Sequence, residues 1–279
     1  MTDFNRLKDC VVTNKNVIVR VDINVPVKDG AIQDDTRIKA VIPTIKYLAE
    51  NKAKVILISH FGRPKGKKNP DMSLKPLVSR IFELLEGKFP VNFADDCLGD
   101  DTREKIAATN YGEVVLLENL RFYDQETKND VDFAKELSSY ANLYVNDAFS
   151  CSHRAHASIV GISDHLKSCA GLLLESELDN LSNLISDAKK PMIAIIGGAK
   201  VSTKYGLIKH LVNKVESIVI GGGMANSFLY AQGKNIGKSL CEKDLREEIL
   251  QIIDQAKKSG GGMNLVTNEA GRPLQWEEL

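Results

Sequence analysis

Short apolar stretches alternate with longer amphipathic stretches along the first two thirds of the chain. The short stretches are rich in Val, Ile and Leu, whereas the longer ones repeat their apolar positions at helical spacing. We predict strands at residues 17–21, 55–58, 114–117 and 143–145, and helices at residues 36–50, 73–86 and 131–140. This order predicts strand–helix–strand units, and hence a parallel sheet with helices on both of its faces.

The same rhythm restarts after Pro191. A helix is expected at residues 175–188, and Lys190-Pro191 ends it, because a residue that precedes proline is pushed out of the α region. Beyond it we predict strands at residues 192–196 and 217–220 and helices at residues 201–212, 224–232 and 244–258, with no further strand after residue 260. The predicted fold is α/β, with two doubly wound, Rossmann-like parallel-sheet lobes at residues 1–188 and 189–279, the second incomplete.

Composition and charge narrow the possible partners. The chain is 43% hydrophobic and 27% charged, as is usual for globular proteins. Lys and Arg together number 37, as do Asp and Glu, so the net charge is zero and no global field attracts nucleic acid or a membrane surface. The charged N-terminus lacks the apolar core of a signal peptide, and no apolar run approaches the roughly 18 residues of a membrane span. We therefore expect a cytoplasmic protein.

Cationic residues follow the predicted strands of the first half. Asp22, Asn24 and then Arg37 follow the first strand, and His60 and Arg63 follow the second. Arg121 follows the third strand, and Arg154 and His156 follow the fourth. A single arginine is more often part of a solvated surface, but the residues after parallel strands meet at one edge of the sheet. Because the planar guanidinium suits phosphate and carboxylate oxygens, this edge predicts a small, multiply anionic ligand. Asp22 and Asn24 suit a substrate hydroxyl, although Asp22 equally suits capping of its own loop.

Glycines follow both predicted strands of the second half. The turns GGA (residues 197–199) and GGG (residues 221–223) would let a phosphate approach backbone N–H groups at a helix N-terminus, and a tight turn alone would also explain them. Neither turn fits G-x-G-x-x-G or the P-loop pattern. Lys200 and Lys204 lie four residues apart at the start of the predicted helix and would share one face, either as anion ligands or as surface lysines.

Two other kinds of site are weaker interpretations. His153, His156 and Cys151 lie close together in the sequence, but no second ligand cluster accompanies them, so we expect no metal site. Cys151 has no orienting acid in a recognisable arrangement and is expected to pack as a small residue. The five cysteines are scattered and form no C-x-x-C pair, so we expect reduced thiols.

Several segments of the sequence resemble motifs of the phosphoglycerate kinase family. They are RVDINVP (20–26), DDTRI (34–38), SHFGRP (59–64), LLENLRF (116–122), NDAFSCSHRAHAS (146–158), IIGGAKVSTK (195–204) and IGGGMANSF (220–228). The motifs follow the family's order, and the resemblance extends to about residue 258, so chance is a negligible explanation. Residues 150–152, Ser-Cys-Ser, depart from the glycine and small residues that the family more often has there.

The resemblance implies a two-lobed, hinge-bending and monomeric kinase of glycolysis. Such an enzyme reversibly transfers a phosphoryl group between ATP, accompanied by Mg²⁺, and the carboxylate of 3-phosphoglycerate, giving ADP and 1,3-bisphosphoglycerate. Carried over by motif, the substrate-binding residues are Asp22, Ile23, Asn24, Arg37, His60, Phe61, Gly62, Arg63, Arg121 and Arg154, supported by His156. The catalytic residues are Arg37, against the reacting carboxylate, and Lys200, which neutralises charge on the transferred group. The nucleotide-binding residues are Gly198, Ala199, Lys204, Gly221 and Gly222, and no side chain is assigned as a metal ligand.

The end of the sequence departs from the family pattern. Family members continue with further strands, an acidic residue that contacts ribose and a GGGD-type turn, whereas the sequence from about residue 261 is expected to be unrelated coil. A truncated or frame-altered product would explain this, and the expected consequence is impaired turnover. Two alternatives stay open: a non-catalytic protein that binds 3-phosphoglycerate through its first lobe, and an inactive gene fragment whose second lobe exposes apolar sheet faces.

Overall fold

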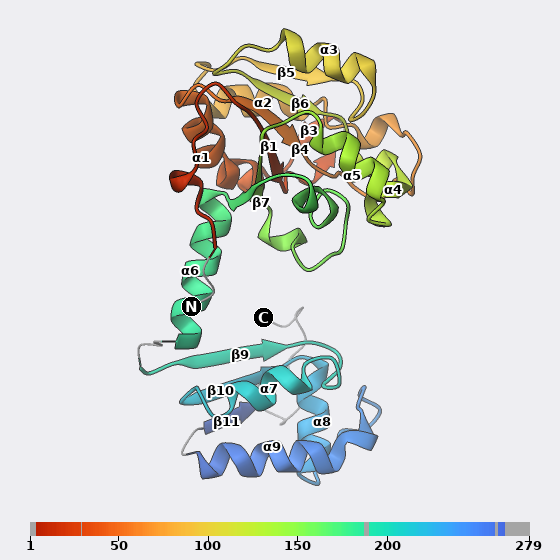
Figure 1. Cartoon of the computed structure of the whole chain (residues 1–279). Coiled ribbons are helices and arrows are strands. Elements are labelled where there is room, and N and C mark those ends of the chain that lie inside the picture. Colours follow the sequence, from red (N-terminus) through yellow and green to blue (C-terminus); the bar gives the residue numbers. More distant parts are fainter. Residues whose placement is uncertain (1–3, 29, 187–189, 260–261, 266–279) are drawn as a thin grey trace. The chain divides into compact units, whose positions relative to one another are not determined.

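The computed structural model describes residues 4–28, 30–186, 190–259 and 262–265. The chain divides into two compact units, Met1–Asn183 (unit 1) and Leu184–Leu279 (unit 2), and each has a hydrophobic core of its own (Figure 1). The division falls near the end of helix α6 (Leu172–Ser186). The boundary predicted from the sequence, between residues 188 and 189, lies outside the described residues.

Six parallel strands form the sheet of unit 1, in the order β5-β6-β4-β1-β7-β8 (Figure 1). They are β1 (Asn16–Val21), β4 (Lys54–Ile58), β5 (Val91–Ala94), β6 (Val114–Leu117), β7 (Leu143–Asp147) and β8 (Ser168–Ala170). β4 and β6 are mainly Val, Ile and Leu and are buried at every position, because both faces of the sheet are covered. The chain leaves β1 toward β4 and later returns to β7 on the other side of β1, so the strand order reverses there. Open α/β sheets bind ligands at such a point.

Two hydrophobic cores lie on opposite faces of this sheet. Val17, Val19 and Val21 of β1 belong to one core and Ile18 to the other, as the two-residue period of a strand requires. Helices α1 (Thr36–Glu50) and α2 (Leu77–Leu84) cover the first core, and α3 (Asp100–Ala108) and α5 (Val131–Ser138) cover the second. The remaining short elements are η1 (Leu7–Asp9), β2 (Val27–Lys28), β3 (Ala31–Ile32), η2 (Pro70–Met72), η3 (Leu120–Phe122), α4 (Asp124–Thr127), η4 (Phe149–Cys151) and η5 (Gly161–Asp164), where η marks a 3₁₀ helix. The predicted doubly wound α/β fold is confirmed for this unit.

Unit 2 contains a three-stranded parallel sheet in the order β11-β10-β9. Its elements are β9 (Ile193–Gly197), α7 (Tyr205–Leu211), β10 (Ser217–Gly221), α8 (Gly223–Ala231), η6 (Lys243–Leu245), α9 (Arg246–Lys258) and β11 (Gly262–Leu265). The core joins Ile196 and Ile220 of the sheet to Phe228 of α8. On the opposite face of β9, Ile193 and Ile195 are 60% and 79% exposed, so no helix of the described residues covers this face of the strand.

The structure corrects the sequence predictions at several elements. The expectation that no strand follows residue 260 is wrong, because β11 pairs with β10 in parallel. Its sequence, GMNL, has too few apolar residues to be recognised as a strand. β5, β8 and α3 were not predicted either: β5 is only partly buried and α3 is mainly polar and charged. The rest of the predicted coil, residues 266–279, lies outside the described residues.

Candidate functional site

Residues from four neighbouring strands of unit 1 meet at the carboxyl edge of its sheet. The strands β6, β4, β1 and β7 are consecutive in the sheet, so the segments that follow them lie beside one another. The predicted substrate-binding residues occupy these segments: Asp22, Ile23 and Asn24 after β1, His60, Phe61, Gly62 and Arg63 after β4, Arg121 in η3 after β6, and Arg154 after β7. Arg37, in the first turn of α1, reaches the same edge through an ion pair with Asp22.

Asp22 is a carboxylate surrounded by donors. Arg37 NH1 lies 3.1 Å from Asp22 Oδ2, Ser150 Oγ donates to the same oxygen, and the backbone N–H of Asn24 donates to Oδ1 at 3.2 Å. Burial alone would raise the pKa of Asp22, but the hydrogen bond from Ser150 and nearby positive charge hold that pKa below its ordinary value. Asp22 therefore does cap its own loop, as one interpretation of the sequence held, and it also presents a charged acceptor at the sheet edge.

Gly62 occupies a position that only glycine fits without strain. Its φ is +59°, and a Cβ there would lie 2.9 Å from Met72 Sδ. The Gly62 N–H donates to Asn24 Oδ1 at 3.0 Å, and the Phe61 N–H donates to Asn119 Oδ1 at 3.1 Å. The side chain of Asn119, which we did not select from the sequence, thus fixes the loop that carries His60 and Arg63.

Arg63, Arg121 and Arg154 line a single cavity of about 420 Å³. Its other lining residues are Lys65, Gly66, Tyr123, Asp124, Thr127 and His156, of which only His156 was selected from the sequence. Arg121 NH1 donates to Gly62 O at 2.9 Å, whereas Arg121 Nε is buried and has no hydrogen-bond partner among the described residues. Burial and the charge of Arg154 lower the pKa of Arg121. An anion in this cavity would offset that electrostatic cost.

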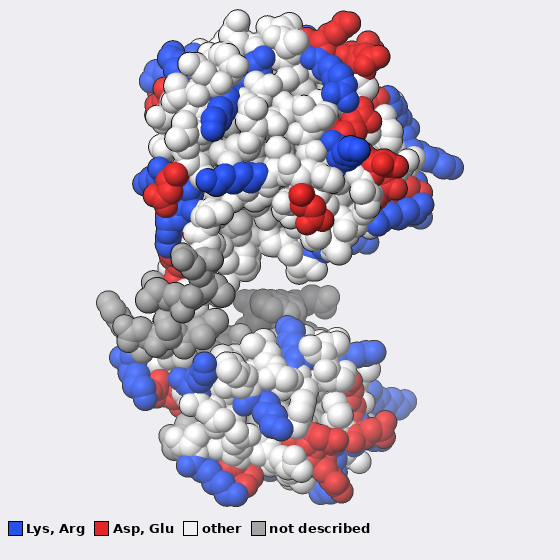
Figure 2. All heavy atoms as spheres, in the orientation of Figure 1, with Lys and Arg blue, Asp and Glu red and all other residues white. Residues whose placement is uncertain are grey.

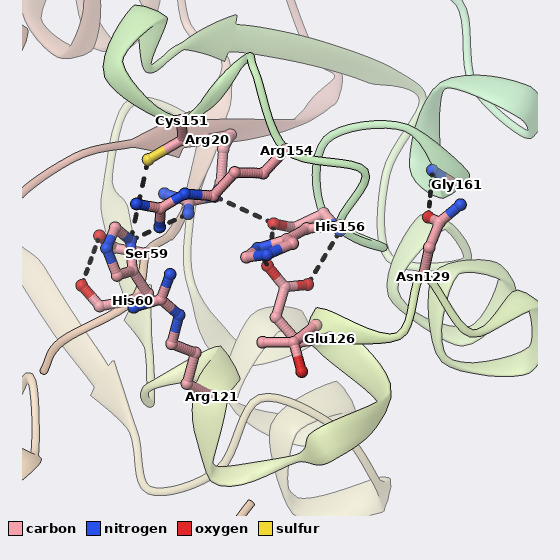
Figure 3. Close-up of polar contacts among 12 residues, drawn as sticks. Arg20, Ser59, His60, Arg121, Glu126, Asn129, Cys151, Arg154, His156 and Gly161 are labelled. Carbon is pink, nitrogen blue, oxygen red and sulfur yellow. Dashed lines mark hydrogen bonds and ion pairs between the residues drawn. The ribbon is translucent and has the colours of Figure 1, made fainter. Parts of the chain in front are cut away.

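Arg20 lies fully buried beside His60 (Figure 3). Its NH2 is 3.0 Å from His60 Nδ1, its Nε donates to Ser158 Oγ at 3.0 Å, and its NH1 donates to the carbonyl of Val21. Burial, together with the charges of Arg20 and Arg121, lowers the pKa of His60 to about 3, so the imidazole is neutral. Sequence reasoning missed Arg20 because it lies within a strand. The available signal was a charged residue in an otherwise apolar strand.

Glu126 is a fully buried anion in the same network (Figure 3). Its Oε1 accepts from Ser158 Oγ at 2.7 Å and lies 3.4 Å from His156 Nδ1, and its Oε2 accepts from the Ser158 N–H at 2.9 Å. Burial would raise the pKa of Glu126, but His156 and Arg20 lower it below the ordinary value, so the carboxylate is charged. Ser158 therefore joins two buried opposite charges. Nothing in the local sequence distinguishes Glu126 from a surface glutamate.

Three potential metal ligands also come together at this edge. One ligand atom each from Asp22, His60 and Cys151 lies within 4.8 Å of the others. The set considered from the sequence was His153, His156 and Cys151, so the two sets share only Cys151. Arg20 faces His60 Nδ1 and Arg37 faces Asp22, so guanidinium groups already occupy the lone pairs that a metal ion would need. We assign no metal site here. Cys151 is buried, and all five cysteines are free thiols.

The two glycine turns of unit 2 pack against each other. The Met224 N–H donates to Gly198 O at 2.8 Å, and a Cβ at Gly222, where φ is +66°, would lie 3.2 Å from that same oxygen. Gly221 ends β10. Close approach of the two backbones and its positive φ therefore account for Gly222.

The structure corrects the helix face that Lys200 and Lys204 were expected to share. Helix α7 begins at Tyr205 rather than at residue 201, so Lys204 occupies the N-cap position and Lys200 lies in the preceding turns. Lys204 Nζ donates to the carbonyl of Gly197, whereas the side chain of Lys200 is exposed. Both lysines follow β9, and the hydrogen bond to Gly197 brings the Lys204 ammonium group to the end of that strand.

Charged side chains of both signs are interspersed on the surface seen in Figure 2. This distribution agrees with the zero net charge, so attraction of an anion depends on the local arginine cluster. Among the residues that the structure describes, no helix is both long and apolar enough to cross a membrane.

The fold and the site define a class: an α/β protein of two units, one of which gathers arginine and histidine side chains around an anion-sized cavity at the edge of a parallel sheet. The family model of phosphoglycerate kinase matches residues 7–270. The chain belongs to the phosphoglycerate kinase family. The match ends at residue 270, about ten residues beyond the point where the sequence was expected to diverge from the family.

Individual relatives agree with this family. The chain is 52% identical over 258 residues to the phosphoglycerate kinase of Rhizobium meliloti (strain 1021), and 51% identical over 259 residues to that of Methylorubrum extorquens (strain PA1); each alignment covers 92% of this chain and 64% of the relative. The solved structure of phosphoglycerate kinase from Coxiella burnetii superposes with a TM-score of 0.81 at 38% identity, covering 94% of this chain and 66% of that one. The chain thus spans about 64% of the length of these curated relatives.

Proposed function

We propose that unit 1 binds 3-phosphoglycerate at the carboxyl edge of its sheet. The observation that carries this proposal is the cavity lined by Arg63, Arg121 and Arg154, where the buried Nε of Arg121 has no partner among the described residues. A phosphate carries about −1.5 to −2 charges near neutral pH, and paired guanidinium bonds to its oxygens are among the stronger hydrogen bonds in proteins. The phosphate group of the substrate occupies this cavity in our proposal.

The other end of the substrate meets Asp22, Asn24 and Arg37. Asp22 accepts a hydrogen bond from the substrate hydroxyl, and Asn24 has its Oδ1 committed to Gly62, which leaves the side-chain amide N–H groups for the ligand. Arg37, whose side chain is 54% exposed, retains donors beyond those bonded to Asp22 and to Asn24 O and lies against the carboxylate.

We further propose that the chain acts in the kinase reaction of its family. A carboxylate oxygen of 3-phosphoglycerate attacks the γ-phosphorus of ATP, the bond to the bridging oxygen breaks, and ADP leaves as the acyl phosphate forms. Little covalent work falls to the protein in such a transfer, so positioning and charge stabilisation dominate. Lys200 neutralises the phosphoryl group in flight, and Lys204 with residues 198–199 and 221–222 receives the nucleotide.

Mg²⁺ enters this proposal with the nucleotide phosphates. Among the described residues, the one cluster of three potential ligand side chains is the guanidinium-engaged set at Asp22 in unit 1. Ser202, in the segment between β9 and α7, donates hydrogen bonds from its N–H and its hydroxyl to the carboxylate of Glu242, which precedes η6. The described side chains therefore fit a metal held mainly by the nucleotide, and we derive no step through a protein-bound ion.

A second candidate function is binding of 3-phosphoglycerate without turnover. It is favoured by the contrast between the closed hydrogen-bond network of unit 1 and the three-stranded sheet of unit 2 with its exposed Ile193 and Ile195. Both candidates predict the same substrate site and differ only in whether ATP is consumed.

Calorimetry with 3-phosphoglycerate and a coupled assay with Mg-ATP test the two candidates. We expect saturable binding that Arg63→Ala and Arg121→Ala weaken by about 10- to 100-fold, since bonds to charged groups contribute roughly 1.5–3 kcal/mol. Arg103→Ala is the matched control, because Arg103 lies on α3 and contacts Ser139 and Glu136. Turnover supports the kinase, and binding without turnover supports the second candidate. If the wild-type chain does not bind, or if Arg103→Ala weakens binding equally, the proposed site is wrong.

A further inference from the structure

The contacts of His60 determine which of its ring nitrogens carries the proton. Nδ1 lies 3.0 Å from Arg20 NH2 and 4.0 Å from Cys151 Sγ. A guanidinium group has donors and no acceptor, so in this hydrogen bond Nδ1 must be the acceptor. A neutral imidazole with a free lone pair on Nδ1 carries its proton on Nε2.

The surroundings of His60 also keep the ring neutral. The side chain is 4% exposed. The charged groups that face it are Arg20 from β1, Arg121 from η3, Arg154 from the segment after β7 and, with opposite sign, Asp22. Burial and these cations outweigh the single carboxylate, and the pKa of about 3 follows from them. The neutral form therefore persists across the physiological pH range.

The hydrogen bonds of the His60 ring to residues that the structure describes all involve Nδ1, and none involves Nε2–H. Nε2–H is thus a donor without a partner among the described residues. His60 does not line the cavity itself, but Arg121 and Arg154, which do, are among the charged groups that face its ring. We propose that Arg20 is a positioning residue that fixes His60 as the neutral Nε2–H tautomer, so that Nε2 donates to an oxygen of the bound anion. This inference rests on the proposed function, in which that anion is 3-phosphoglycerate.

Arg20 is suited to this task because its own position is fixed in several directions. It is 0% exposed, so it does not contact a ligand directly and acts on the ligand through His60. Its three nitrogens bond separate groups: Ser158 Oγ, Val21 O and His60 Nδ1. Ser158 is held in turn by Glu126, and its carbonyl accepts from Tyr144 OH at 2.8 Å. The chain of contacts runs from a buried carboxylate to the donor at the site (Figure 3).

The first test is nuclear magnetic resonance of the ¹⁵N-histidine-labelled chain without ligand. We expect His60 to show a protonated Nε2 and an unprotonated Nδ1, unchanged between about pH 8 and pH 5. The exposed His165 and His210 are internal controls for solvent-exposed rings in the same sample. A proton on Nδ1, or a doubly protonated ring above about pH 6, overturns the inference.

The second test compares His60→Gln with His60→Asn. The amide nitrogen of Gln reaches the position of Nε2, whereas that of Asn reaches only the position of Nδ1. We expect His60→Gln to bind 3-phosphoglycerate about 10- to 100-fold more tightly than His60→Asn, as for a hydrogen bond to a charged group. Equal affinities of the two variants contradict a donor at Nε2.

Arg20→Lys tests the positioning role directly. Lysine keeps a positive charge opposite Glu126 but lacks the planar fork that bonds three groups at once. We expect a mixture of His60 tautomers and weaker binding, while an unchanged tautomer contradicts a role for Arg20. If this variant fails to fold, the wild-type spectrum and the comparison of His60→Gln with His60→Asn still test whether Nε2 carries the proton and donates to the anion. Titration with inorganic phosphate distinguishes the inference about His60 from the proposed function. If phosphate changes the ¹⁵N chemical shift of Nε2 but 3-phosphoglycerate does not bind, the proposed function is refuted and the tautomer is supported.

Discussion

Units 1 and 2 share the same strand–helix rhythm but bury their sheets to different extents. The strand β4, KVILI, is buried at every position, whereas β9, IAIIG, which is as apolar, alternates between exposed and partly or fully covered residues. In unit 1 two cores lie on the two faces of the sheet, and in unit 2 the described residues form a core on one face. An apolar run thus predicts a strand, but burial depends on what other segments cover it.

The two units also differ in their buried charges. Among the described residues, the buried carboxylates Glu118, Glu126 and Asp147 all belong to unit 1. Each of them accepts hydrogen bonds that shape the sheet edge, for example from Ser73 to Glu118 at 2.6 Å. The glycine turns of unit 2 rely on backbone contacts instead. The polar site of unit 1 therefore includes the desolvation cost of buried carboxylates, and the described part of unit 2 has no such cost.

The largest effect is expected from a cavity in the core of unit 2. Phe228→Ala removes a fully buried ring, and such changes cost about 3–5 kcal/mol. Because the free energy of unfolding of small domains is roughly 5–15 kcal/mol, we expect the backbone amides of unit 2 to lose most of their protection against hydrogen exchange. Hydrogen exchange resolved by segment measures this, with 3-phosphoglycerate affinity as the readout of unit 1.

Leu57→Ala is the matched change in unit 1. Leu57 is fully buried in β4, and its truncation is expected to cost about 2–5 kcal/mol. We expect it to lower protection in unit 1 and to leave α8 and α9 protected. If either variant lowers protection equally in both units, they unfold as one cooperative body and the contrast between them is not energetic.

A smaller effect is expected from Asp147→Asn at the end of β7. Asp147 Oδ1 accepts from the N–H groups of Leu173 and Leu174 at 2.9 and 3.1 Å, whereas Oδ2 is buried without a partner among the described residues. Burial raises the pKa of Asp147 to about 6. A carboxyl group whose pKa is higher in the folded state contributes stability that is full below about pH 4 and lost as the pH rises through about 6.

The amide of the substituted side chain keeps an acceptor without the charge, so Asp147→Asn is expected to raise the unfolding free energy of unit 1 by about 1–3 kcal/mol at pH 7.5. The gain should vanish near pH 4, and urea unfolding at the two pH values measures it. Glu177→Gln, on the same 250 Å³ cavity, is the control for a general change in charge. A gain that is equal at both pH values would show that ionisation of Asp147 is not its cause.

The sequence predicted the strands and their following cations well because both depend on local rules. The runs at residues 17–21 and 114–117 are short and rich in Val, Ile and Leu, which is enough to predict strands. The positions of the following arginines depend on the edge at which parallel strands end. Arg20 and Glu126 could not be predicted in the same way. Their pairing joins residues far apart in the sequence, and a buried charge becomes interpretable only when its partner is known.

The smallest effect is expected on the exposed face of β9. Ile195 is 79% exposed, so Ile195→Thr should change the unfolding free energy of unit 2 by less than about 0.5 kcal/mol, as for most surface substitutions. Its neighbour Ile196, 6% exposed, is the control, and Ile196→Thr is expected to cost several-fold more because it places a hydroxyl in the core. Urea unfolding of both variants at several protein concentrations tests this pair. Equal losses would mean that a cover is present on this face in solution, and a loss that grows with protein concentration would identify the cover as a second copy of the chain.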